Sequence, residues 1–205
     1  MARQTIPWHQ WVVVDDCVPA TRTTLGQERV EPRPVWESGQ ITLGRNLLAG
    51  LERTTGDAIA VIEDDDWYSP DYLENMSKNL AEAPLVGEGF VRYYNVRTRH
   101  YLEQTNARHA CLSASMWRQS LTPRIAGVVG KNLSSPWYDL SIWRAIDSFI
   151  LVLTRRFMVG IKGMPGRRGI GIGHHPGGCR NPDPNLEKLR EWVGEDADCY
   201  AAYGC

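Results

Sequence analysis

Residues 58–71 read AIAVIEDDDWYSPD, and this segment carries the clearest signals for the fold. Its first five residues form an apolar run with the length of a buried strand, and four consecutive acids end that run. A helix is predicted next, because Ser69 supplies a capping hydroxyl, Pro70 suits the first turn and Asp71 adds early negative charge. Its apolar face consists of Tyr72, Leu73, Met76 and Leu80. The stretch therefore predicts a strand, an acidic turn and a helix in succession.

Similar signals elsewhere extend this alternation of strands and helices. Residues 11–14 form a second apolar run that ends in acids, and residues 41–54 carry leucines at helical spacing. The other predicted elements are an edge strand near 33–36, short strands and loops at 85–125, a helix at 138–149, a strand at 157–161, a helix at 184–193 and a C-terminal tail. Alternating strands and helices predict an α/β fold, in which ligands bind outside the carboxyl ends of the strands.

The composition is that of an ordinary globular protein. The chain has 205 residues, of which 42% are hydrophobic and 23% charged, and this suits one large domain with its own core. Its longest apolar run, residues 149–153, is far shorter than the roughly 20 residues of a membrane-spanning helix. The N-terminus lacks the apolar segment of a secretory signal, and five widely spaced cysteines favour reduced thiols. These features predict a cytoplasmic protein without a membrane span.

The net charge of -1 hides an uneven distribution of charge along the chain. Residues 1–88 carry 7 basic and 15 acidic side chains, residues 89–180 carry 14 and 3, and residues 181–205 carry 2 and 6. The basic middle segment favours an anionic partner, either substrate phosphates or a nucleic acid. Folding that interleaves these charges into neutral surface pairs is an equal alternative.

The acidic turn at residues 63–66 is the strongest local signal for chemistry. Four adjacent carboxylates repel one another and favour a cation, and their hard oxygen atoms suit Mg²⁺ or Mn²⁺ bound to substrate phosphates. A solvated acidic turn that caps the next helix is the alternative, because acids are favoured at helix starts. The position at a strand end favours the metal site.

Two further patterns point to a nucleotide. Asp15 and Asp16 follow a strand of their own, so they are expected to share a cleft with the acidic turn and to hydrogen-bond a base or ribose. Arg45, near the start of the helix at 41–54, suits a bidentate contact with phosphate, although a surface arginine fits the spacing equally well.

Together these motifs resemble family 2 glycosyltransferases of the GT-A fold. The resemblance rests on the segments RQTIP (3–7), WVVVDD (11–16), GRN (44–46) and TGDAIAVIEDDDWYSPDYL (55–73), and it is specific to about residue 80. It implies a Rossmann-like mixed sheet flanked by helices. Family members begin with a strand and a helix before the turn at 3–7, so this chain is expected to lack that first strand and helix.

The resemblance also implies a division of the chain. A single catalytic domain is expected at residues 1–178, with the nucleotide-sugar-binding part at 1–88 and the acceptor part with a glycine-rich lid at 89–178. A C-terminal helix and tail are expected at 179–205.

Site residues follow from matching positions. In the family the first aspartate pair contacts the nucleobase, here Asp15 or Asp16, and an Asp-x-Asp element holds a metal on the diphosphate. Glu63, Asp64 and Asp65 match that element, so Glu63 and Asp65 are the expected metal ligands and Asp64 an expected contact of the donor. A glutamate in the first position departs from the family pattern, which puts Asp65 ahead of Glu63 as ligand.

The general base of the family is a carboxylate near the start of a later helix, and Asp139 is the best match. A carboxylate can take the proton of an acceptor hydroxyl while a metal holds the departing diphosphate. An ordinary acid at a helix start is an equal alternative for Asp139. His174 or His175 is expected to reach the metal, as a histidine near the C-terminus does in similar enzymes, although a surface histidine fits the sequence equally well.

Residues 160–178 contain eight glycines and are predicted to form a mobile lid that excludes water. The basic residues of this lid, Lys162, Arg167 and Arg168, are expected to contact the diphosphate when it closes.

The resemblance implies an inverting, metal-dependent glycosyltransferase of the hexosyltransferase type (EC 2.4), with a nucleoside-diphosphate donor such as a UDP-sugar. The basic middle segment is compatible with a modified base in DNA as acceptor, as in phage-type DNA glycosyltransferases, or with another anionic acceptor. Two other classes stay open. A metal-dependent nuclease or nucleotidyltransferase would also combine clustered acids with basic residues, and a non-catalytic nucleotide-binding module would bind without turnover.

Overall fold

The computed structural model describes residues 3–15, 27–30, 41–166, 169, 171–175 and 177–203, and at 27–30 it describes the backbone. The helices are α1 (Leu43–Leu51), α2 (Tyr72–Leu80), α3 (Thr122–Gly130), α4 (Tyr138–Ala145), α5 (Glu187–Val193) and α6 (Ala197–Ala201). Four short 3₁₀ helices are η1 (Leu112–Ala114), η2 (Gln119–Leu121), η3 (Ile172–His174) and η4 (Gly194–Asp196). Within the described parts of the chain, no helix has both the length and the apolar character that crossing a membrane requires.

The strands form three sheets. They are β1 (Trp11–Val14), β2 (Gln27–Val30), β3 (Ala58–Ala60), β4 (Trp67–Tyr68), β5 (Leu85–Glu88), β6 (Phe90–Asn95), β7 (His100–Thr105), β8 (Ser115–Arg118), β9 (Ile150–Val152), β10 (Met158–Lys162) and β11 (Asn181–Pro182). β1 and β2 pair in parallel, a four-stranded sheet has the order β3-β8-β5-β9, and a five-stranded sheet has the order β11-β7-β6-β10-β4.

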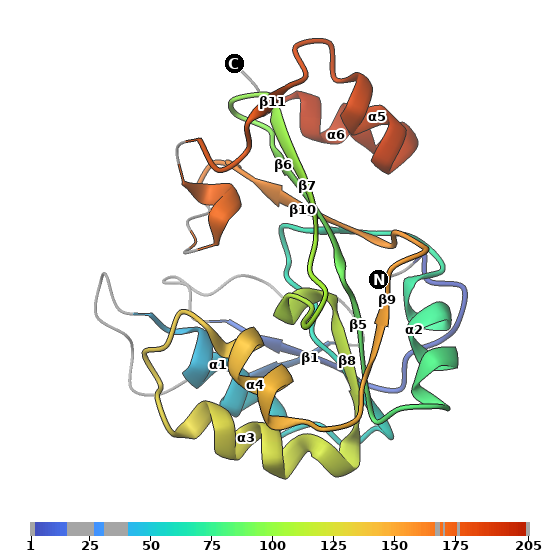
Figure 1. Ribbon diagram of the computed structural model, residues 1–205, viewed down its shortest axis with the longest axis vertical. Coiled ribbons are helices and arrows are strands. Elements are labelled where there is room, and N and C mark those ends of the chain that lie inside the picture. Colours follow the sequence, from blue (N-terminus) through green and yellow to red (C-terminus); the bar gives the residue numbers. More distant parts are fainter. Residues whose placement is uncertain are drawn as a thin grey trace.

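Helices cover both faces of the four-stranded sheet (Figure 1). Successive side chains on a strand point to opposite faces, so Leu85 packs in a core with α1, α3 and α4, whereas Val86 packs against α2. On β8, Trp117 packs in the core with α1, α3 and α4, and Met116 packs in the core with α2. Burial on both faces explains why the strand at 58–62 is an apolar run without polar alternation.

Strand direction brings several carboxyl ends to one edge of this sheet. β8 is antiparallel to both β3 and β5, and β9 is parallel to β5, so β3, β5 and β9 all run in the same direction. The acidic turn follows β3 at this edge, and Glu88 ends β5 there. The prediction that the acidic turn lies at the carboxyl edge of a sheet is confirmed.

The C-terminal helices cover one face of the five-stranded sheet (Figure 1). Tyr94 on β6 and Ile161 on β10 pack there against Leu189 and Trp192 of α5. Since side chains alternate along a strand, the neighbouring residues Tyr93 and Lys162 face away from α5. This second face of the sheet belongs to the candidate site.

The predicted elements differ from the observed ones in several places. The predicted helix at 138–149 ends at Ala145, α3 was not predicted, and β2 lies in a region predicted as loop. Residues 194–201, predicted as part of a tail, form η4 and α6, where Ala197 is buried. The predicted edge strand at 33–36 lies outside the described residues.

Candidate functional site

The acidic turn is held in place by the strand that follows it. Tyr68 on β4 pairs with Met158 on β10, and its hydroxyl donates to the Ser113 carbonyl oxygen over 3.1 Å. The same hydroxyl accepts a hydrogen bond from the Glu63 amide, again at 3.1 Å. The backbone of the turn therefore has a fixed position between the two sheets.

Three carboxylates converge on this turn. Glu63, Asp65 and Asp66 each offer an oxygen atom, and these oxygens all lie within 4.8 Å of one another. The structure thus brings together the two predicted metal ligands, Glu63 and Asp65, and adds Asp66, a member of the acidic turn that was not singled out as a ligand. Asp64 is exposed and is not part of this group.

Asp66 is the buried member of the group. Its side chain is 0% exposed, and its Oδ1 atom accepts hydrogen bonds from the Ile161 amide at 3.0 Å and from the Lys162 ammonium at 2.9 Å. Its Oδ2 atom is also buried but has no hydrogen-bond partner among the described residues. A buried carboxylate oxygen without a partner is costly, so this atom marks a place where a cation would be stabilised.

Lys162 lies on the inner side of the carboxylates. Its Nζ atom is 3.6 Å from Glu63 Oε2, and its side chain is only 6% exposed. Burial on its own would lower the pKa of Lys162, but the negative charges of Asp66, Glu63 and Asp65 outweigh burial and raise it. Lys162 was predicted on a mobile lid, whereas the structure places it at the end of β10.

The donor set fits a divalent cation. Glu63, Asp65 and the Oδ2 atom of Asp66 offer hard oxygen donors, and Glu63 is 39% exposed, so the group is open on one side. Mg²⁺ and Mn²⁺ prefer such ligands and usually keep coordination positions for water and phosphate oxygens.

The two candidate histidines differ in position. Burial, together with the positive charge of Lys162, lowers the pKa of His174 on η3, while Asp65 acts in the opposite direction. His174 is therefore within electrostatic range of the carboxylate group. His175 is exposed, and among the described residues the group within 4.8 Å contains neither histidine. Their metal role stays a prediction.

The structure describes only some of the residues that are predicted to contact the nucleotide. Asp15 follows β1 and is 7% exposed, and Arg45 lies in the first turn of α1, which packs against β1. Asp16, Arg167 and Arg168 lie outside the described residues, so their predicted roles are untested.

Asp139 lies in the first turn of α4, as predicted for the general base. Partial burial raises the pKa of its carboxyl group above the usual 3.8, and the backbone hydrogen bond from Leu140 and the nearby His109 oppose this effect. A raised pKa makes a carboxylate a better proton acceptor, as a general base requires.

Tyr93 on β6 is a site residue that the sequence analysis missed. Its ring lies 5.8 Å from Lys162 Nζ, and it packs so closely on Gly160 that a Cβ atom at that position would lie 2.4 Å from the ring. Burial raises the pKa of Tyr93 well above 10, and the charges of Glu63, Asp66 and Asp139 add to this effect. Tyr93 therefore lies within range of both the carboxylate group and Asp139. Nothing in the local sequence around Tyr93 points to this position.

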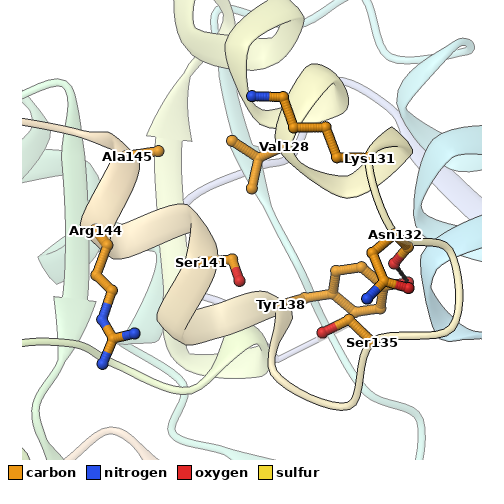
Figure 2. A pocket seen from close by; sticks show the side chains of 8 residues that line it. All are labelled: Val128, Lys131, Asn132, Ser135, Tyr138, Ser141, Arg144 and Ala145. Carbon is orange, nitrogen blue, oxygen red and sulfur yellow. Dashed lines mark hydrogen bonds between the residues drawn. The ribbon is translucent and has the colours of Figure 1, made fainter.

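A separate hollow of about 380 Å³ lies between α3 and α4 (Figure 2). The described residues that line it are Val128, Lys131, Asn132, Ser135, Tyr138, Ser141, Arg144 and Ala145. No predicted site residue is among them, and Tyr138 uses its hydroxyl to donate to the Asn132 carbonyl oxygen at 2.7 Å. The hollow is therefore distinct from the carboxylate group.

Crystal structures of S. aureus TarS are similar in fold. TarS 1-349 in complex with UDP-GlcNAc gives a TM-score of 0.58 at 14% identity, covering 85% of this chain and 55% of that one. Longer TarS gives a TM-score of 0.53 at 14% identity, covering 78% and 32%. This chain thus spans between a third and just over half the length of the TarS structures it matches. The likeness confirms the predicted GT-A fold with its mixed sheets and flanking helices. No curated protein matches the sequence significantly.

The family comparison covers most of the site described above. The model of glycosyl transferase family 2 matches residues 2–141, which include β1, the acidic turn, Tyr93 and Asp139. Since the match extends over more than half of the chain, the protein belongs to glycosyl transferase family 2.

Proposed function

We propose that this chain transfers a sugar from a UDP-sugar to an acceptor hydroxyl, with inversion at the sugar carbon and with Mg²⁺ or Mn²⁺ as cofactor. The observation that carries the proposal is the group of three carboxylates after β3 in a chain of family 2, in which the buried Asp66 Oδ2 atom has no hydrogen-bond partner among the described residues. The crystallised TarS complexes with UDP and UDP-GlcNAc support UDP as the nucleotide.

Residues around the donor have distinct tasks in this proposal. Glu63, Asp65 and Asp66 hold the metal, which supplies positive charge to the departing diphosphate. Asp64 contacts the donor, and Lys162, whose ammonium lies on the buried side of the carboxylates, acts on the diphosphate through its positive charge. Asp15 and Arg45 contact the nucleotide, together with Asp16, and Arg167 and Arg168 approach from the glycine-rich segment.

Asp139 is the proposed general base. Its carboxylate takes the proton from the acceptor hydroxyl as that oxygen bonds to the sugar carbon and the diphosphate leaves from the opposite face. One base and one displacement give inversion. His174 or His175 is proposed to complete the metal site, and the side chains around it exclude water that would compete with the acceptor.

The acceptor is proposed to be anionic. Arg97, Arg108, Lys131 and Arg144 are exposed and have no ion pair within the part of the chain that the structure describes. Arg124 and Arg156 form ion pairs with Asp147 and Glu103, as expected if surface pairs neutralise the basic segment. The four arginines and lysines named above do not follow this pattern among the described residues. A hydroxymethylated DNA base and an anionic glycan are the two acceptor types to compare, and both would bind less tightly as salt increases.

The test is UDP release from a panel of UDP-sugars with Mn²⁺ and each acceptor type. Wild type is expected to release UDP only with metal, whereas Asp65→Ala and Asp139→Asn are expected to lose at least about 100-fold in kcat. Glu82→Gln, at an exposed position remote from the carboxylates in sequence, is the matched control and should keep full activity.

Three outcomes would contradict the proposal. UDP release that persists unchanged in Asp65→Ala would remove the metal assignment. Release of UMP, or cleavage of a phosphodiester without sugar transfer, would indicate a nuclease or nucleotidyltransferase. Tight UDP-sugar binding without turnover for any acceptor would indicate a binding module.

A further inference from the structure

Lys162 closes the buried side of the carboxylate group. It donates to Asp66 Oδ1 over 2.9 Å and lies 3.6 Å from Glu63 Oε2, with its own side chain 6% exposed. The backbone amide of Ile161 donates to the same Oδ1 atom. Neighbouring residues of β10 therefore hold one oxygen of Asp66 and leave the other, Oδ2, unpartnered among the described residues.

Formal charges define what the open side of this group can accept. Counted as ionised groups, Glu63, Asp65 and Asp66 carry three negative charges, and Lys162 supplies one positive charge. Two negative charges then remain, which is the amount that one divalent ion neutralises. Without Lys162, a fully buried carboxylate would face two others with no cation beside it, and such an arrangement is strongly destabilising.

We infer that Lys162 is the resident countercation of the metal site, a positioning residue that compensates Asp66 when no metal is bound and limits the site to one divalent ion. This role adds to the electrostatic effect of Lys162 on the diphosphate that is proposed above. The metal part of the inference rests on the proposed function, whereas the pairing of Lys162 with Asp66 concerns the metal-free protein alone.

Replacing Lys162 by methionine separates the two effects of its charge. Lys162→Met keeps an unbranched side chain that is one atom shorter but leaves Asp66 uncompensated, so the Tm in EDTA is expected to fall by roughly 10 °C. The same change removes a positive charge next to the metal, so Mn²⁺ should bind at least about tenfold more tightly. A lysine with a merely structural role would change the Tm but not tighten metal binding.

Free Mn²⁺ is measured by its EPR signal, and the Tm by differential scanning fluorimetry with EDTA or Mn²⁺. Lys162→Arg keeps the charge and is expected to bind Mn²⁺ within about threefold of wild type. The double variant Lys162→Met with Asp66→Asn removes both charges, while the asparagine oxygen still accepts from the Ile161 amide, so its Tm in EDTA should return to within a few degrees of wild type.

The inference would be overturned if the Lys162→Met variant folds but binds Mn²⁺ no more tightly than wild type. If Lys162→Met does not fold in EDTA, the double variant decides, because a Tm that stays low despite the neutral pair would equally overturn it. Absence of Mn²⁺ binding by wild type would defeat the proposed function, but the EDTA measurements would still test the pairing of Lys162 with Asp66.

Discussion

Glu88 shows how a single buried carboxyl group links this fold to pH. It is 1% exposed, and its Oε2 atom accepts from the amides of Phe157 at 2.8 Å and Met158 at 3.1 Å. Burial raises the pKa of Glu88 from 4.5 to about 7, although the two amides and Arg92 favour the charged form. Its Oε1 atom has no hydrogen-bond partner in the described part of the chain.

The sign of the pH dependence follows from this raised pKa. Between about pH 4.5 and pH 7 the folded state holds a proton on Glu88 that the unfolded state has released, so stability falls as the pH rises through this range. The whole penalty is about 3 kcal/mol and is complete above pH 7. Glu88→Gln cannot ionise and is therefore expected to match wild type at pH 5 and to exceed its stability at pH 8.

Urea unfolding of both proteins at pH 5, 6, 7 and 8 measures this effect. Glu82→Gln, which removes an exposed carboxylate, should show no comparable change. A difference between Glu88→Gln and wild type that stays constant from pH 5 to pH 8 would contradict the expectation.

At the scale of elements, the N-terminal turn serves as a cap for α2. The first-turn amide of Leu73 donates to Gln4 Oε1 at 2.9 Å, and Gln4 Nε2 donates to the Ser69 carbonyl oxygen at 2.8 Å. The N-cap residue itself, Asp71, makes no side-chain capping bond. Gln4 therefore supplies the cap from a distant part of the sequence and fixes the helix that follows the acidic turn.

Gln4→Ala is expected to destabilise the protein by about 1 kcal/mol, because a helix-start amide in a partly buried position loses its acceptor. Thr5→Ala is the matched control, since its hydroxyl contacts Glu74 at an exposed position and should contribute less than about 0.5 kcal/mol. Urea unfolding at pH 7 gives both values. Equal losses in the two variants would mean that Gln4 is not a cap.

Elements with strong local signals could be predicted from the sequence, and those without could not. β1 and β3 are apolar runs, and α2 has apolar residues at helical spacing, and these local signals do not depend on distant residues. α3 has the sequence TPRIAGVVG, in which glycines and β-branched residues disfavour a helix, and it forms because Ile125 and Val129 are buried in the core beside α4. Here tertiary packing overrides local propensity.

At the scale of the whole molecule, some residues of the candidate site could likewise be predicted from local sequence, and others could not. Glu63 and Asp65 are two residues apart in the sequence and follow a clear strand, so their grouping could be predicted. Lys162 is 96 residues from Asp66, and Tyr93 reaches the site only because β6 pairs with β10. Such contacts depend on the topology of the sheets, which local patterns do not specify.

Three distant segments also meet at Asp196 on η4. Its carboxylate accepts two hydrogen bonds from the Arg3 guanidinium and one from Trp67 Nε1, the last at 2.7 Å. The hydrogen bond from Arg3 lowers the pKa of Asp196, and the Trp67 bond adds to this effect while burial opposes it. The contact joins the N-terminal turn and β4 to the C-terminal helices.

Asp196→Asn is expected to lower stability at pH 7 by about 1 kcal/mol, since Arg3 is largely exposed and solvent screens much of the pair. Because the folded pKa of Asp196 is depressed, its stabilising contribution is present above the unfolded value of 3.8 and is lost as the pH falls below it. The free energies of unfolding of wild type and Asp196→Asn should therefore converge in acid.

Asp198→Asn is the control, because Asp198 is 82% exposed and 3.7 Å from Arg190. Its free energy of unfolding should stay within about 0.5 kcal/mol of wild type. Urea unfolding at pH 3 and pH 7 measures both, and a loss in Asp196→Asn that is equal at the two pH values would show that the charge of Asp196 does not hold the three segments together.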